Sequence, residues 1–491
     1  MDGSRPSGRE FLSFVKRESI DSPDLSIVDA TEPDLLRDIF PWERPPALVL
    51  DGVSVPTEVP AELWITDTTF RDGQQAREPY TQEQMVHLYG LLGRLGGPQR
   101  RISMSEFFLY TKKDINTVVE CLRRGDGPKV TAWIRATSKD VALFEETSRR
   151  IRAETGLELD ETGILTSLSD YHVFFKYGRK GRREVLEGYL ALVEEVLRAG
   201  FACRCHLEDV TRSNVMGVVV PFVRRLMRLA ETHGRPVVIR IPDTVGVGVP
   251  WDVAALPRSI PKLVYLLRHV CGVPAEWLEF HGHQDLGLGI ANATAAWMYG
   301  AARNNGTLLG VGERAGNIPL ETLVFAYGGF RGRFDGMDTR VITEIVEYYE
   351  KALGHRNPDF APITGRNFAM TRAGVHADGT LKNVEMYLPF DVEALLGVAP
   401  RAGVTPYSGT AGIAFWLQAT YGSSGRSFSK DDALVRRIHE SVEGIFACGR
   451  TTSLSDREME ALVMRLGGPE SGVTASAAAS AVPVEADEGR G

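Results

Sequence analysis

The chain has 491 residues, 43% of them hydrophobic and 24% charged, which is typical of a globular protein with a large core and a smaller second domain. The formal net charge of −8 argues against nucleic acid as the main partner, and no apolar run approaches the ~18 residues that span a bilayer. The five cysteines lack CxxC spacing, which favours a reducing, cytoplasmic setting over a disulfide framework.

Residues 1–60 are predicted to form an N-terminal extension. Prolines recur from Pro6 to Pro60, so long helices and strands are not expected there. The first residues, 1–14, are polar and contain no apolar signal core. Four aromatic side chains indicate that parts of the extension pack on the main body: Phe11, Phe14, Phe40 and Trp42.

Between residues 61 and 345, short apolar segments alternate with helical stretches. The predicted strands are Leu63–Thr68, Arg101–Phe108, Lys129–Ala136, Glu161–Ser167, Ala202–Asp209, Val237–Pro242, Trp277–His283 and Thr307–Gly312. The predicted helices between them include Gln82–Leu95, Arg182–Ala199, Val215–Thr232 and Leu286–Arg303. Eight such units predict an α/β fold, a (β/α)8 TIM barrel that forms the catalytic domain. An open doubly wound sheet is the alternative, but no GxGxxG follows the first strand.

Residues 346–466 are predicted to form a mainly helical C-terminal subdomain that contributes to the active site. Its clearest helix is Asp431–Phe446. Residues 467–491 are rich in Gly, Ser and Ala with a late acidic run and are predicted to be a disordered tail.

Polar side chains follow nearly every predicted strand at the end where barrel enzymes carry their active sites. They are Arg71-Asp72, Ser169–His172, Glu208-Asp209, Asp243-Thr244, His281 with His283, and Glu313–Asn317. Because alternate side chains of a strand share a face, His281 and His283 point the same way. Two imidazoles on one face make half of a metal site. The alternative is that the two histidines are only hydrogen-bonded residues of the strand. The presence of Arg71-Asp72 and Asn317 in the same chain favours the metal site over this alternative.

Four motifs occur in a fixed order: Asp67-Thr-Thr-Phe-Arg-Asp-Gly-Gln-Gln75, His281-Gly-His283, Gly312-Glu-Arg-Ala-Gly-Asn317 and Gly374-Val-His-Ala-Asp378. In this the chain resembles the DRE-TIM metallolyase superfamily over about residues 35–415. Within it, the chain is similar to the condensing branch of homocitrate and isopropylmalate synthase relatives, and most of all to Re-type citrate synthases and 2-phosphinomethylmalate synthases. Gln284 follows the second histidine, at a position where relatives often carry Asn or Asp. The short stretch after Gly409 leaves no room for a leucine-binding regulatory domain, which speaks against an isopropylmalate synthase.

The resemblance implies an acetyl-CoA-dependent acyltransferase. It would add the methyl carbon of acetyl-CoA to a four-carbon-like 2-oxo acid, oxaloacetate or phosphinopyruvate, and then hydrolyse the thioester. A divalent metal, Mn²⁺ before Mg²⁺ or Co²⁺, would activate the oxo acid. Its expected ligands are Asp72, His281 and His283, with Asn317 as a further ligand or a water-holding neighbour. The expected partners are small-molecule substrates and a second copy of the chain, a homodimer.

The catalytic residues implied are Arg71, which stabilises the developing alkoxide, and His376, the general base. His376 lies outside the barrel and would reach in from the C-terminal region or from a neighbouring subunit. Glu208 is expected to assist the base, and Tyr387 to donate a hydrogen bond to the thioester oxygen. A structural role is the alternative for each of these side chains.

The expected substrate-binding residues are Thr244, His172, Gln75 and Arg212. Thr244 would bind the substrate carboxylate or, alternatively, cap a helix. A second substrate anion calls for an arginine, and Arg77, Arg212 and Arg240 are the candidates. Other functions stay open: a homocitrate-, citramalate- or isopropylmalate-type synthase, a retro-aldol lyase, or a non-catalytic binding relative. The loop after the eighth strand lacks the cysteine of CoA-thioester lyases, and intact Asp72, His281 and His283 argue against a non-catalytic relative.

Overall fold

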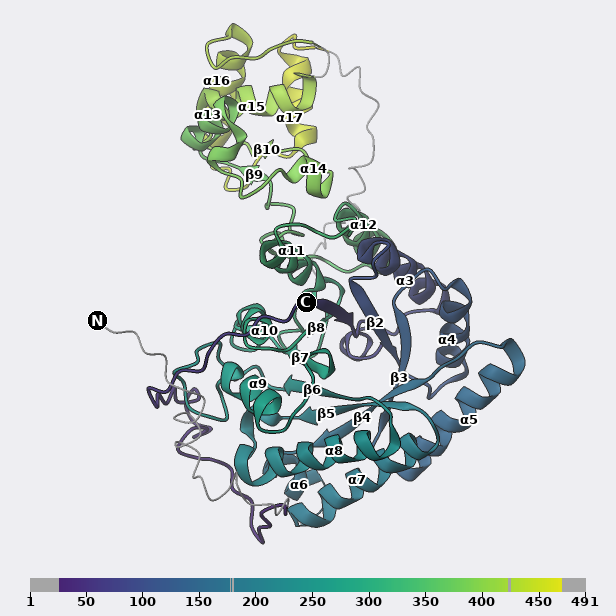
Figure 1. The fold of residues 1–491 in the computed structure, drawn as a ribbon. Coiled ribbons are helices and arrows are strands. Elements are labelled where there is room, and N and C mark those ends of the chain that lie inside the picture. Colours follow the sequence, from purple (N-terminus) through teal and green to yellow (C-terminus); the bar gives the residue numbers. More distant parts are fainter. Residues whose placement is uncertain (1–25, 177, 179–180, 423–424, 470–491) are drawn as a thin grey trace, which may run out of the picture. The chain divides into compact units, whose positions relative to one another are not determined.

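The computed structural model describes residues 26–176, 178, 181–422 and 425–469. The chain divides into two compact units, residues 1–356 and 357–491 (Figure 1). No helix in the described ranges is both long and apolar enough to cross a bilayer. Phe11 and Phe14 of the predicted extension lie outside the described residues, as does the predicted tail from residue 470 onward.

The first unit is a closed barrel of eight strands that follow one another around the ring (Figure 1). Every strand pairs in parallel with its sequence neighbour, and β1 pairs with β8 to close the barrel. The predicted (β/α)8 fold is therefore confirmed. The strands are β1 Trp64–Asp67, β2 Ile102–Phe107, β3 Lys129–Arg135, β4 Glu161–Ser167, β5 Ala202–Glu208, β6 Val237–Asp243, β7 Leu278–Gly282 and β8 Arg303–Gly306.

Helices lie between the strands and around the barrel (Figure 1). Several begin where a side chain caps the first turn: Thr81 Oγ1 accepts from the backbone N–H of Gln84, and Thr111 does the same for Asp114. Each such cap stabilises its helix by ~1 kcal/mol. The helices are α3 Gln82–Gly96, α4 Lys112–Arg124, α5 Ser138–Thr155, α6 Asp170–Lys176, α7 Arg182–Arg198, α8 Val220–His233, α9 Ile260–His269, α10 Gly289–Met298, α11 Leu320–Arg331 and α12 Val341–Leu353.

The eighth strand and the helix before it differ from the prediction. Strand β8 is Arg303–Gly306, and α10 ends at Met298. The predicted strand at 307–312 instead starts with a short 3-10 turn. The polar residues of β8 concealed the strand, because their amides are satisfied by partners outside the strand: Asn304 Nδ2 donates to the Ala293 carbonyl at 2.8 Å, and Asn305 Nδ2 to Thr66 Oγ1 at 2.9 Å.

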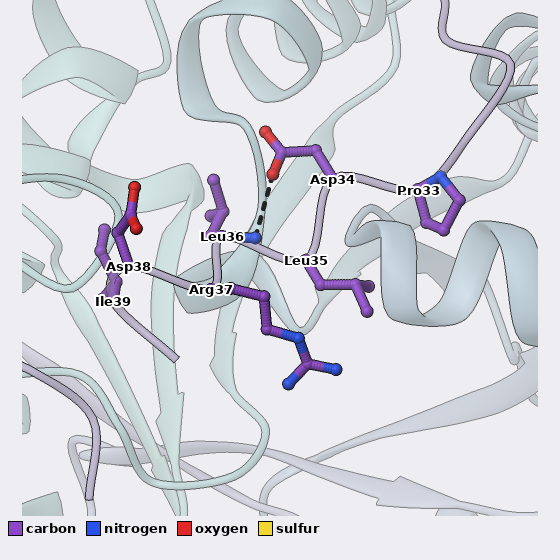
Figure 2. A pocket seen from close by; sticks show the side chains of 7 residues that line it. All are labelled: Pro33, Asp34, Leu35, Leu36, Arg37, Asp38 and Ile39. Carbon is purple, nitrogen blue, oxygen red and sulfur yellow. Dashed lines mark hydrogen bonds between the residues drawn. The ribbon is translucent and has the colours of Figure 1, made fainter. Parts of the chain in front are cut away.

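The described part of the N-terminal extension is tied to the barrel by polar contacts. The Asp34 N–H donates to Asp170 Oδ2 at 2.7 Å, and Figure 2 shows the adjoining turn, which lines a pocket with residues 33–39. Further along, the fully buried Lys262 of α9 pairs with Asp51. Phe40 is buried as expected, whereas Trp42 is 88% exposed, which corrects its predicted packing.

The barrel interior holds charged side chains where aliphatic layers are usual. Arg240 of β6 is fully buried; its Nε donates to Glu279 Oε1 at 2.5 Å and its Nη1 to Glu106 Oε2 at 3.0 Å. Arg204 of β5 lies 2.9 Å from Glu161 Oε1 and 3.2 Å from Glu279 Oε2. Arg240 was a candidate for binding a substrate anion. The structure corrects this expectation, because its guanidinium is engaged by two carboxylates inside the barrel.

The second unit is mainly helical around its own core. The core joins Ile413 and Leu417 of α15, Val435 and Ile438 of α16, and Met459 of α17. A two-stranded sheet, β9 Met370–Thr371 and β10 Arg401–Ala402, accompanies these helices. The helices are α13 Gly374–Lys382, α14 Val392–Leu396, α15 Gly409–Tyr421, α16 Ala433–Ala447 and α17 Asp456–Arg465.

Candidate active site

Three side chains at the carboxyl ends of β1 and β7 form a compact cluster. Ligand atoms of Asp72, His281 and His283 all lie within 4.8 Å of one another. The Asp72 Oδ2 atom is 3.4 Å from His281 Nε2 and 3.6 Å from His283 Nε2. All three residues are buried. The structure thus brings together the three predicted metal ligands from segments more than 200 residues apart.

Hydrogen bonds behind the cluster orient His281. Its Nδ1 lies 2.7 Å from Asn305 Oδ1, and the Asn305 amide nitrogen donates to Thr66 Oγ1. With the Asn305 oxygen as the acceptor, Nδ1 donates to it, and Nε2 is the ring atom that faces Asp72. Metal-binding histidines are commonly oriented in this way by a neighbouring acceptor.

The protonation states of Asp72 and His283 suit a divalent metal. Burial acts to raise the pKa of Asp72, but Arg71 and His281 hold it well below its usual value. Burial, with a contribution from His281, lowers the pKa of His283 to about 4. A carboxylate and neutral imidazoles are the forms that bind metals. Among the described residues, His283 Nδ1 and Asn317 Oδ1 are also buried without a hydrogen-bond partner, so the donor set fits a divalent cation.

Arg71 joins the cluster to the wall of the barrel. Its Nη1 donates to Asp72 Oδ1 at 2.8 Å, and its Nε to Glu106 Oε2 at 2.9 Å. Burial opposes the charge, but Asp72 and Glu106 hold the pKa of the guanidinium above its usual value. The guanidinium also lies over the Trp133 ring, 5.2 Å from its centroid. Arg71 is therefore a rigid, permanently charged group beside the cluster.

A cavity of about 190 Å³ opens in front of the cluster. Seven predicted site residues line it: Arg71, Asp72, Gln75, Glu208, Thr244, His281 and His283. Glu313 and Arg314, from the polar stretch predicted after the eighth strand, line it too, whereas the remaining lining residues were not predicted: Trp133, Leu165, His206 and Pro242. Strand alternation would have placed Trp133 on a barrel face, but its apolar neighbours made it look like core.

The remaining predicted barrel residues lie beside the cavity or away from it. Asn317 Nδ2 donates to Asp72 Oδ2 at 2.8 Å. His172 Nδ1 lies 3.4 Å from Glu208 Oε2. Arg212 stacks on Tyr171 at 4.1 Å and its Nε donates to Asp209 Oδ1, so the structure does not bring it into the cavity lining. Arg77 donates to the Leu353 carbonyl.

His376 and Tyr387 belong to the second unit, where His376 lies in the first turn of α13. The two rings are 4.4 Å apart and tilted by 35°. The predicted base and its predicted hydrogen-bonding partner are thus neighbours within that unit. Their contact with substrate stays a prediction.

Comparison with known proteins gives consistent matches. The sequence profile of the HMGL-like family matches residues 62–348. The chain is 40% identical over 447 residues to a citrate (Re)-synthase of Clostridium kluyveri, covering 91% of this chain and 96% of that protein. It is 42% identical over 439 residues to a citrate (Re)-synthase of Syntrophus aciditrophicus, covering 89% and 68%. It is 34% identical over 456 residues to a 2-phosphinomethylmalate synthase of Streptomyces hygroscopicus, covering 91% and 100%.

Proposed function

This chain belongs to the HMGL-like family, and from that premise we propose that it is an acetyl-CoA-dependent acyltransferase. It joins the methyl carbon of acetyl-CoA to the ketone of oxaloacetate or phosphinopyruvate, and thioester hydrolysis then releases CoA with citrate or 2-phosphinomethylmalate. Relatives with these two names match the chain over 91% of its length. The expected resemblance to the condensing branch of the superfamily is confirmed by the same matches.

The observation that carries the proposal is the buried cluster of Asp72, His281 and His283 beside Arg71 in one cavity. A divalent metal at these residues, Mn²⁺ first and Mg²⁺ or Co²⁺ next, would act as a Lewis acid on the carboxylate and keto oxygens of the 2-oxo acid. Asn317 is the neighbour that orients Asp72.

The chain's own side chains supply the remaining steps. Arg71 has Nε and Nη1 engaged by Glu106 and Asp72, so its Nη2 is the donor for the alkoxide oxygen. Thr244 Oγ1 accepts from the Asp209 N–H at 2.8 Å, which leaves its hydroxyl proton for the substrate carboxylate.

The base is assigned to the second unit. In this proposal His376 takes the proton from the methyl carbon of acetyl-CoA, and Tyr387, whose ring is tilted against the imidazole, donates to the thioester oxygen. Glu208 lines the cavity and His172 lies against it, so this pair holds the incoming substrate. Gln75 also lines the cavity. Arg212 Nε donates to Asp209, and a contact of its other guanidinium nitrogens with the substrate stays a prediction.

Two further expectations, on the oligomeric state and on the cellular location, extend the proposal. The resemblance to condensing synthases supports a homodimer, which analytical ultracentrifugation tests directly. A cytoplasmic location is the second expectation, which the cysteine spacing of the sequence favours.

The test is a thiol-release assay with acetyl-CoA, Mn²⁺ and a panel of 2-oxo acids. We expect CoA release with oxaloacetate or phosphinopyruvate and little with 2-oxoisovalerate. A chelator should abolish the release, and added Mn²⁺ should restore it. Release only with 2-oxoisovalerate or 2-oxoglutarate would overturn the substrate assignment, and no release with any acid would overturn the proposed function.

A further inference from the structure

We propose that Trp133 is a specificity-determining residue, whose indole N–H donates a hydrogen bond to the second anionic group of the substrate. That group is the distal carboxylate of oxaloacetate or the phosphinate of phosphinopyruvate. The inference rests on the proposed function and names the side chain that distinguishes dianionic 2-oxo acids from apolar ones of similar length.

The starting observation is a buried donor without a partner. Trp133 belongs to β3, is 7% exposed and lines the cavity. Its Nε1 has no hydrogen-bond partner in the described part of the chain. Leaving such a donor unpaired costs ~1–3 kcal/mol, and buried indole N–H groups usually find a partner. A phenylalanine would fill the wall without that cost, so an unpaired N–H on a side chain that lines the cavity is a donor for a ligand there.

Arg71 contacts both the metal cluster and the indole. Its Nη1 lies 2.8 Å from Asp72 Oδ1, and its guanidinium lies 5.2 Å from the centre of the Trp133 ring. Asp72, Arg71 and Trp133 all line the same cavity. In the proposal, a 2-oxo acid held at the cluster by its first two carbons directs its fourth carbon, which carries the second anion, toward Trp133.

Neighbouring rings hold the indole in one orientation. Phe108 meets it edge-on at 5.5 Å between ring centroids, and His206 does so at 6.4 Å. Gly163 on β4 makes this packing possible, because a Cβ there would lie 3.2 Å from Trp133 Cδ1 and only 2.6 Å from His206 Nε2. A donor fixed in advance loses little entropy on binding, which is what specificity requires.

Two other basic side chains of the lining are already engaged by protein partners. Arg314 Nε donates to Asp285 Oδ1 at 2.7 Å. His206 Nε2 faces Glu106 Oε1 at 3.2 Å, and its Nδ1 faces Arg240 Nη1 at 3.4 Å. Burial and the nearby Arg240 hold the pKa of His206 well below its usual value, so the ring is neutral. Arg71 and Thr244 are assigned to the alkoxide and the first carboxylate, which leaves Trp133 and Gln75 as lining donors for the second anion, and of these Trp133 is the buried one.

The test compares substrate binding by the Mn²⁺-loaded wild type and by Trp133→Phe, using isothermal titration calorimetry. The ligands are oxaloacetate, phosphinopyruvate and 2-oxobutyrate, which has four carbons but no second anion. We expect the preference for the dianionic acids over 2-oxobutyrate to fall about 10-fold or more in the variant, because a site built around a hydrogen bond discriminates by ~1–3 kcal/mol. Affinity for 2-oxobutyrate and metal content should not change.

The matched control is Trp297→Phe. Trp297 is fully buried and its Nε1 also lacks a described partner, but it packs against Tyr327 and Phe330 and does not line the cavity. An unpaired indole alone is therefore no sign of a ligand, and this variant should keep the full preference. If both variants change the preference equally, the assignment to Trp133 is wrong.

A second measurement needs no substitution in the binding site. In the wild type with ¹⁵N-labelled indoles, one N–H proton resonance should move downfield when oxaloacetate or phosphinopyruvate is added, and it should stay in place with 2-oxobutyrate. Unmoved indole resonances, in a protein that still releases CoA from acetyl-CoA with a dianionic acid, would overturn the role of Trp133 and leave the proposed function standing. Absence of CoA release with every acid would instead remove the proposed function.

Discussion

The barrel contains two buried, charged regions that are organised differently. In the interior, Arg204, Arg240 and Glu279 are fully buried and face one another across strands β5, β6 and β7. At the carboxyl end of the strands, ligand atoms of Asp72, His281 and His283 lie within 4.8 Å of one another. The interior charges are paired with opposite charges, whereas the cluster at the mouth gathers ligand atoms that can share one cation. The first region holds the barrel together, and the second is built to bind something from solution.

The largest effect that would test this contrast is expected for His283→Ala. Removing one of three ligands should lower bound Mn²⁺ to background and reduce CoA release by about 10³-fold or more, since the metal supplies the Lewis acid. Metal analysis and the thiol assay measure both. The control is His269→Ala, a surface histidine paired with Glu58, which should leave both unchanged. Full metal content in His283→Ala would show that the cluster is not the metal site.

The next largest effect concerns the interior. In Arg240→Met, Glu106 and Glu279 lose their shared cation inside the barrel, and breaking a buried ion pair costs ~3–5 kcal/mol. Urea unfolding measures the loss. Arg94→Met removes an exposed pair with Glu344 and should cost less than ~1 kcal/mol. Equal stability of the two variants would remove the distinction between interior and surface charge.

The smallest effect is expected at the boundary between the regions. Asn305→Ala removes the acceptor that orients His281, and loss of such a partner weakens metal binding ~10–100-fold. Competition with a fluorescent chelator gives the affinity. Asn304→Ala is the matched control, because that amide donates to the Ala293 carbonyl and does not contact the cluster. A wild-type metal affinity in Asn305→Ala would mean that His281 is oriented by the strand alone.

Local patterns predicted most of the barrel and the three clustered ligands. The period-2 spacing of His281 and His283, and the polar residues after nearly every strand, are visible in short windows of sequence. Strand β8 was missed because Asn304 and Asn305 are polar but satisfied by distant partners. Arg240 was misjudged for the same reason, since its carboxylates come from β2 and β7. Pairings between strands far apart in sequence leave no local signal, and the role proposed for Trp133 depends on such neighbours.

The contact between Asp51 and Lys262 has a practical consequence for expressing the barrel by itself. The matched family region starts at residue 62, so a fragment trimmed to that boundary would lack Asp51, which pairs with Lys262 of α9. Arg258 would lose the Pro46 and Ala47 carbonyls in the same cut. A fragment that keeps these contacts therefore begins upstream of residue 46, before the start of the matched family region.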